Sequence, residues 1–116
     1  METLTIYHNP RCSKSRAALA LLQEKKVPLR VVEYLKEPLS FEELKKLQRL
    51  LGLSPREWVR KGEEEYKKAK LGPESSDDDI LRAMAKYPIL MERPIVVRGK
   101  RAVVGRPPEK VLELLG

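Results

Sequence analysis

A chain of 116 residues with one cysteine and a formal net charge of +7 is long enough for one domain with a single hydrophobic core. One cysteine cannot form an internal disulfide, and together with one histidine it provides too few ligands for a structural zinc site. The N-terminal residues lack the basic and apolar segments of an export signal, and no apolar run reaches the roughly 18 residues of a membrane span. We therefore expect a cytoplasmic protein with no metal site and no membrane partner.

The positive charge by itself would suit a nucleic-acid partner. However, the basic residues are mostly interleaved with acidic ones, as in Glu42-Glu43-Leu44-Lys45-Lys46, which is typical of solvated helix faces. Aromatic residues make up only 5% of the chain, so few rings are available on which bases could stack. The pattern favours a small anionic substrate over nucleic acid.

The first part of the chain predicts a strand, a helix and a second strand. Residues 3–7 alternate polar and apolar side chains, which predicts a strand, and apolar residues at helical spacing predict a helix over residues 13–26. Val27-Pro28 ends this helix, and residues 29–35 predict the second strand. Such a succession is typical of two parallel strands joined by a right-handed crossover.

Residues 40–87 predict a helical insertion. Several segments carry helix-start signals, such as a serine cap, a capping box or a proline at the first helical position. These segments begin at Ser40, Ser54 and Ser76. A further short helix is expected within residues 61–75, which are charged and lack strong periodicity. Breaks between them are predicted at Gly52, at an exposed turn around Gly72-Pro73 and at Pro88.

The last part of the chain predicts a hairpin and a helix. Residues 95–98 and 101–104 are strands joined by the two-residue turn Gly99-Lys100, and Pro107-Pro108 starts a terminal helix. The fold class is therefore α/β, with a mixed four-stranded sheet built as βαβ and then ββα. We expect a single domain over residues 1–116, interrupted by the helical insertion at about residues 40–87.

The only histidine, asparagine and cysteine of the chain fall within His8–Cys12. Cys12 is predicted at the junction of the first strand and the helix, where unpaired backbone N–H groups and the positive end of the helix dipole favour a thiolate. Arg11, Lys14 and Arg16 add positive potential, and the same N–H groups can hold a tetrahedral anion. We expect a pKa for Cys12 below the ~8.5 of a free thiol. A buried cysteine without chemistry is the alternative.

The neighbours of Cys12 each allow two interpretations. His8 is a candidate general base or a cation that lowers the thiol pKa, but it can also be a structural histidine. Asn9 and Ser15 can hydrogen-bond the sulfur or the loop, or simply form the turn and cap the helix. Ser15 also makes the motif C-x-x-S, so an external thiol must resolve any bond formed at Cys12.

Three separated motifs carry a resemblance to a known family. They are HNPRCSKSR at residues 8–16, PILMERPIVV at residues 88–97 and Gly105-Arg106-Pro107. Over nearly the whole chain, this pattern resembles the glutaredoxin-coupled arsenate reductases. The resemblance implies a thioredoxin-like fold and a cytoplasmic oxidoreductase of arsenic detoxification. It also implies glutathione as co-substrate, glutaredoxin as partner and no bound cofactor.

The resemblance also implies roles for individual residues. Cys12 would be the catalytic nucleophile, Arg60, Arg93 and Arg106 would bind the oxyanion, and the bond before Pro94 would be cis. From their positions beside the cysteine, and not from the resemblance, we expect a supporting role for His8, Asn9, Ser15 and Arg16. In the implied reaction the Cys12 thiolate attacks arsenate or a similar oxyanion, glutathione attacks the adduct, and glutaredoxin regenerates the thiol. The planar guanidinium groups suit bidentate contacts with oxyanions.

Two other functions remain open. One is a monothiol redox protein that exchanges with glutathione or protein thiols and has no arsenate activity. The other is a redox-linked regulator that binds RNA polymerase, a class that typically carries C-x-x-C. Ser15 argues against a dithiol switch, but not against a regulator without one.

Overall fold

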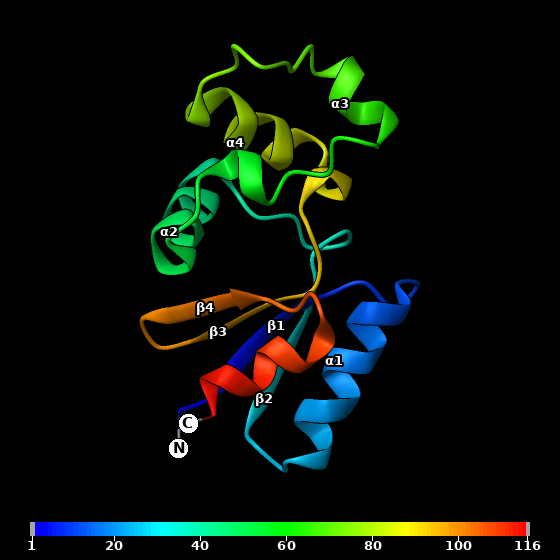
Figure 1. Cartoon of the computed structure of the whole chain (residues 1–116), viewed down its shortest axis with the longest axis vertical. Helices are drawn as coiled ribbons and strands as arrows, with labels where there is room; N and C mark the ends of the chain where they lie inside the picture. Colours follow the sequence, from blue (N-terminus) through cyan, green and yellow to red (C-terminus); the bar gives the residue numbers. More distant parts are fainter. Residues whose placement is uncertain (1, 116) are drawn as a thin grey trace. The chain divides into compact units, whose positions relative to one another are not determined.

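The computed structural model describes residues 2–115 and divides the chain into two compact units (Figure 1). Met1–Glu37 and Arg93–Gly116 form the first, which we call the sheet unit. Pro38–Glu92 forms the second, which we call the helical unit. That both belong to a single domain stays a prediction.

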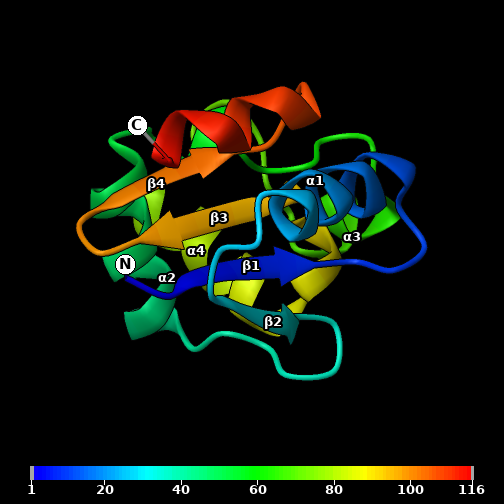
Figure 2. The same ribbon diagram turned by 90° about the horizontal axis from the view of Figure 1, so that it is seen from below.

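The sheet unit contains four strands in the order β2-β1-β3-β4 (Figure 2). The strands are β1 (Leu4–His8), β2 (Leu29–Glu33), β3 (Ile95–Arg98) and β4 (Arg101–Val104). β1 pairs in parallel with β2, whereas β3 pairs antiparallel with both β1 and β4. The predicted mixed four-stranded sheet is therefore confirmed.

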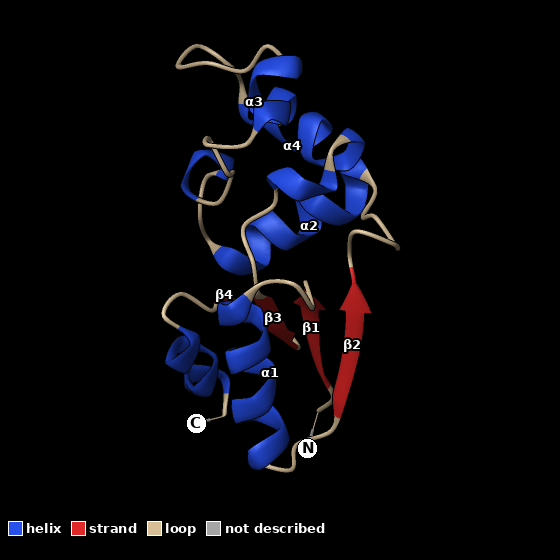
Figure 3. Cartoon of the chain, turned by 90° about the vertical axis from the view of Figure 1, so that its right-hand side faces the viewer, coloured by secondary structure: helices blue, strands red, loops and turns tan. Residues whose placement is uncertain are grey.

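The core of the sheet unit follows from the alternation of side chains along β1. Because successive side chains of a strand point to opposite faces, Leu4 and Ile6 enter the same buried layer. Helix α1 (Ser13–Glu24) and the 3-10 helix η3 (Pro108–Leu114) pack against each other and lie on one side of the strands (Figure 3). The buried cluster consists of Leu4, Ile6, Ala18, Leu22, Val96, Val111 and Leu114.

Some element ends differ from the prediction. β2 ends at Glu33 instead of residue 35, because the carbonyl of Glu33 accepts hydrogen bonds from the N–H groups of Lys36 and Glu37 in a tight turn. The terminal helix is of the 3-10 type, since its N–H groups bond to carbonyls three residues earlier, as from Lys110 to Pro107. The local signals placed both elements but not these details.

The helical unit confirms the predicted helix starts at Ser40 and Ser76. It contains α2 (Phe41–Leu51), η1 (Pro55–Glu57), α3 (Glu64–Lys68), α4 (Asp77–Lys86) and η2 (Pro88–Leu90), and α2 packs against α4. At the start of α2 the Ser40 hydroxyl accepts from the Glu43 N–H at 3.2 Å, and the Glu43 carboxylate accepts from the Ser40 N–H at 3.0 Å. Gly52 ends α2 with a φ of 66°, a left-handed conformation that glycine adopts without strain.

The helix predicted after Ser54 is only the single turn η1. After η1 the extended backbone pairs with residues 90–92. Val59 forms an isolated antiparallel β-bridge with Met91, and the Arg60 N–H donates to the Leu90 carbonyl at 2.7 Å. A backbone paired in this way cannot continue a helix. Within residues 2–115, no helix is both long and apolar enough to cross a membrane.

Candidate active site around Cys12

Cys12 lies where the sequence predicts it, at the N-terminal end of α1. β1 ends at His8, a turn follows, and Cys12 is the extended N-cap residue of the helix. The Cys12 N–H donates to the Asn9 carbonyl at 3.0 Å, and the Cys12 carbonyl accepts from the Arg16 N–H at 3.0 Å. The thiol is free and half-buried. The junction thus presents the sulfur to the first backbone N–H groups of the helix.

The surroundings of the sulfur favour its ionised form. Partial burial is the largest single influence and opposes ionisation. Hydrogen bonds from the Ser15 N–H, the Arg93 guanidinium and the Lys14 N–H, together with the Arg93 charge, outweigh it. The pKa of Cys12 is therefore lowered from its ordinary value, in the predicted direction.

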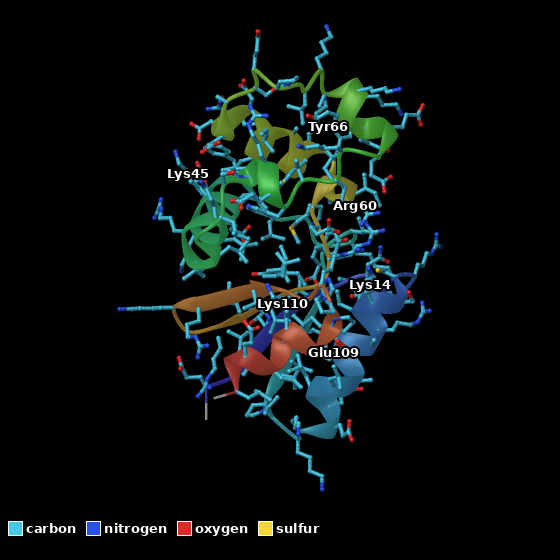
Figure 4. All side chains as sticks on the ribbon, viewed as in Figure 1. Lys14, Lys45, Arg60, Tyr66, Glu109 and Lys110 are labelled. Atoms are coloured by element: carbon cyan, nitrogen blue, oxygen red, sulfur yellow. The ribbon has the colours of Figure 1, made fainter. Side chains whose placement is uncertain are left out.

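The cation beside the sulfur is not one of those expected from the motif. Arg93 is the arginine that lowers the thiol pKa, and it comes from the segment before β3. The Arg16 guanidinium instead donates to the Pro10 carbonyl at 2.9 Å. Lys14, on the first turn of α1 (Figure 4), acts on the sulfur through its backbone N–H. That the side chains of Arg11, Lys14 and Arg16 add positive potential around the thiol stays a prediction.

A buried hydrogen-bond network holds the loop in front of Cys12. The Ser15 side chain is completely buried, and its hydroxyl lies 2.6 Å from Nδ1 of His8. The same hydroxyl accepts from the Asn9 N–H at 3.0 Å, while Oδ1 of Asn9 accepts from the Arg11 N–H at 3.0 Å. The side chains of Asn9 and Ser15 thus bind the loop, and it is the Ser15 backbone that reaches the sulfur.

His8 is held in its neutral form by this environment. Burial lowers the pKa of His8 most strongly, the charge of Arg16 lowers it further, and the Glu33 carboxylate only partly opposes them. A neutral imidazole can accept the Ser15 hydroxyl proton at Nδ1. The structure therefore gives His8 a partner in the loop, and its direct part in proton transfer stays a prediction.

Arg93 and Arg106 come together from the two ends of the β3–β4 hairpin. Nε of Arg106 donates to the Arg93 carbonyl at 3.0 Å, and the Gly105 N–H donates to the Pro94 carbonyl at 2.8 Å. The peptide bonds before Pro94 and Pro107 are both cis. The hairpin thus holds Arg93 and Arg106 in one neighbourhood, and Arg93 reaches the Cys12 sulfur.

The sequence analysis did not identify the structural role of Gly105. A Cβ at this position would lie 2.8 Å from Cγ of Pro94 and 3.0 Å from Cγ1 of Val111. Only glycine lets the chain pass so close to the segment that carries Arg93. The sequence signal that could have pointed to Gly105 is its position in the Gly105-Arg106-Pro107 motif. The local pattern by itself does not explain why that position needs a glycine.

Arg60 belongs to the helical unit. Its Nε lies 3.2 Å from Oε1 of Glu63, and its Nη1 lies 3.0 Å from Oε1 of Glu92 (Figure 4 labels Arg60). The guanidinium of Arg60 is thus paired with two carboxylates of the helical unit. Its part as a third oxyanion-binding arginine stays a prediction.

The site as a whole suits attack by a thiolate on an anionic centre. A thiolate, the backbone N–H groups at the start of α1 and the Arg93 guanidinium lie together, so a bound oxyanion would find its charge balanced beside the nucleophile. Over residues 2–115 no three histidine, cysteine or acidic side chains are grouped to hold a metal ion. The fold and the site define a thiol-based protein with a thioredoxin-like fold.

Comparison with known proteins identifies the family. The model of the ArsC family matches residues 7–114, and the chain belongs to this family. It is 46% identical over 117 residues to the arsenate reductase of Neisseria meningitidis serogroup A, covering 99% of this chain and 100% of that protein. It is also 50% identical over 113 residues to the Escherichia coli K12 protein named "Uncharacterized protein YfgD", covering 96% and 95%.

A solved structure shows the same architecture. The arsenate reductase from Vibrio cholerae superimposes with a TM-score of 0.92 at 49% identity, covering 97% of each chain. The thioredoxin-like fold expected from the motifs is therefore confirmed.

Proposed function

We propose that this protein is a cytoplasmic arsenate reductase that uses glutathione and glutaredoxin as its source of electrons. One observation carries the proposal: Cys12, at the N-terminus of α1 and hydrogen-bonded by Arg93, has a thiol pKa that favours the nucleophilic form. Its support is the 46% identity to the Neisseria meningitidis arsenate reductase over 99% of the chain. A reducing compartment such as the cytoplasm keeps a lone thiol of this kind available.

The first step forms a bond between the Cys12 sulfur and arsenic. The thiolate attacks arsenate, and one arsenate oxygen takes up protons and leaves as water. Both partners are anionic, so the attack needs positive charge at the site. We assign this charge to Arg93, which hydrogen-bonds the Cys12 sulfur, and we assign Arg106 and Arg60 to the remaining oxygens.

The later steps supply two electrons from outside the chain. The glutathione thiol replaces a second arsenate oxygen, which leaves as water. A glutaredoxin thiolate then attacks the glutathione sulfur, and the electron pair of the broken sulfur–arsenic bond remains on arsenic. Arsenic(V) becomes arsenic(III), and the two external thiols become a mixed disulfide. Water then replaces Cys12 at arsenic(III), which releases arsenite and the free thiol.

External thiols are required because the sequence holds a single cysteine and has Ser15 at the resolving position. Glutathione thus enters as a co-substrate, and the reaction as written needs no bound cofactor. Asn9, Ser15 and His8 serve the reaction by fixing the loop, and Arg16 by tying α1 to the Pro10 carbonyl.

The decisive experiment is an arsenite assay. Purified protein is incubated with arsenate, glutathione, glutaredoxin, glutathione reductase and NADPH, and arsenite is measured directly as it forms. The Cys12→Ser variant, checked for folding by circular dichroism, serves as the control. We expect arsenite formation to depend on the wild-type chain and on both thiols. Arsenite at the level of Cys12→Ser would refute the proposal.

The monothiol redox function remains a second candidate, because the free, half-buried thiol can exchange with other thiols whether or not it meets arsenate. It predicts that oxidised glutathione adds one glutathione to Cys12, detected by the mass of the intact chain. A chain that forms this mixed disulfide but produces no arsenite would support the second candidate over the first. An unchanged mass would exclude it.

A further inference from the structure

A cavity of about 200 Å³ lies in the sheet unit, beside the loop that carries Cys12. One wall is the stretch His8–Arg11, at the end of β1, and the other is formed by Glu33, Leu35 and Lys36, at the end of β2. We call it the β2-end cavity. The roles already assigned around the sulfur use the loop wall, and of the side chains opposite only Glu33 enters them, through the effect of its charge on His8.

The loop wall of the β2-end cavity leads directly into Cys12 along the chain. Its lining stops at Arg11, and Cys12 is the next residue, with a Cα about 3.8 Å further along the chain. The hydrogen bond from the Cys12 N–H to the Asn9 carbonyl, 3.0 Å long, closes the turn between them. The cavity therefore borders the loop that carries the nucleophile.

The chemistry of the walls is that of a site for a zwitterionic peptide. Leu35 is 40% exposed and is one of two large apolar side chains that residues 2–115 leave exposed. Arg11 and Lys36 supply two positive charges, and Glu33 supplies one negative charge. Nζ of Lys36 lies 3.6 Å from Oε1 of Glu33, but the Lys36 side chain is 79% exposed and the Glu33 side chain 40%, so this pair is weak and can exchange partners.

We propose that the β2-end cavity binds glutathione, the co-substrate of the proposed function on which this inference rests. Glutathione carries two carboxylates and one ammonium group, which match the two cations and the one carboxylate of the walls. Its methylene groups lie against Leu35, and its thiol, in the middle of the tripeptide, extends past Arg11 towards Cys12. The cavity is smaller than the roughly 300–1,000 Å³ of pockets for drug-sized ligands, so part of the tripeptide stays in solvent and the affinity is low.

Binding can be measured without any reaction. The probe is S-methylglutathione, which has no free thiol, and the protein is the Cys12→Ser chain labelled with nitrogen-15. In an NMR titration we expect the amide signals of residues 8–12 and 33–36 to shift together and to saturate with one dissociation constant. Shifts confined to other residues, or none, would overturn the proposal.

A matched pair of charge reversals tests the recognition. Lys36→Glu should weaken binding about three- to tenfold, since an exposed attraction is replaced by a repulsion. Lys25→Glu makes the same change of net charge at the far end of α1, about 20 Å along the helix axis from Cys12, and should leave binding unchanged. Equal weakening by both variants would mean attraction by net charge alone and would also refute the site.

The NMR titration and the arsenite assay together distinguish failure of the glutathione site from failure of the proposed arsenate reductase function. If the wild-type chain yields no arsenite but the titration behaves as described, the arsenate reductase proposal fails and the glutathione site stands. If arsenite forms but no saturable shifts occur in residues 8–12 and 33–36, the function stands and the site is refuted.

Discussion

Replacing Gly105 by alanine tests the close approach of the chain to the segment that carries Arg93. The added Cβ would lie 2.8 Å from Cγ of Pro94 and 3.0 Å from Cγ1 of Val111, where real contacts need about 3.5–4.0 Å. Pro94 is a rigid ring, and Val111 is completely buried in the core. Neither atom is the free end of a flexible side chain, so the contact is relieved only by a shift of the backbone.

The size of the effect follows from overpacking of a well-packed core. Such insertions cost about 1–3 kcal/mol of unfolding free energy. For a chain of this size each kcal/mol lowers the melting temperature by about 4 °C, so we expect a fall of about 4–12 °C. Because the shift also displaces the Pro94 backbone, the thiol pKa of Cys12 should rise as Arg93 moves away.

The assay is thermal and urea unfolding followed by circular dichroism, with Gly62→Ala as the matched control. A Cβ on Gly62 meets nothing within 4 Å, so its stability should stay the same or rise slightly. If Gly105→Ala is as stable as Gly62→Ala and keeps the wild-type thiol pKa, the reasoning about close packing at Gly105 is refuted.

Three further predictions concern the site. Arg93→Ala should raise the pKa of the Cys12 thiol, because a hydrogen bond and a positive charge are lost. The control variant Arg11→Ala should leave this pKa unchanged. The ultraviolet absorbance of the thiolate, followed against pH, measures the pKa in both variants. Ser15→Ala should lower the unfolding free energy by about 1–3 kcal/mol in urea, since it leaves buried polar groups without their hydroxyl partner, and an unchanged midpoint would contradict the network. Burial lowers the pKa of His8 below 6.5, so the unfolded chain binds a proton more readily than the folded one. The unfolding free energy should therefore fall as the pH drops below 6.5, and His8→Gln should remove that part of the slope.

Local signals predicted much of the element order. The capping box of Ser40 and Glu43 and the left-handed Gly52 both act within a few residues, so the bounds of α2 follow from the sequence. The hairpin of β3 and β4 and the position of Cys12 at the start of α1 are equally local. By contrast, η1 stops after one turn because residues 59 and 60 pair with residues 90 and 91, a contact that no local pattern reveals.

For the site, the sequence alone determined that the protein has one reactive cysteine at a strand-to-helix junction and no resolving thiol beside it. Backbone amides at a helix start follow from local structure, so the lowered thiol pKa could be predicted in direction. Only the tertiary structure decided that Arg93 supplies the charge beside the sulfur, since Arg93 and Cys12 are brought together by the sheet. It also decided that Gly105 permits this approach, and that the ends of β1 and β2 enclose a cavity. The reason is the same in each case: contacts between distant segments depend on strand pairing and packing, which the local sequence does not encode.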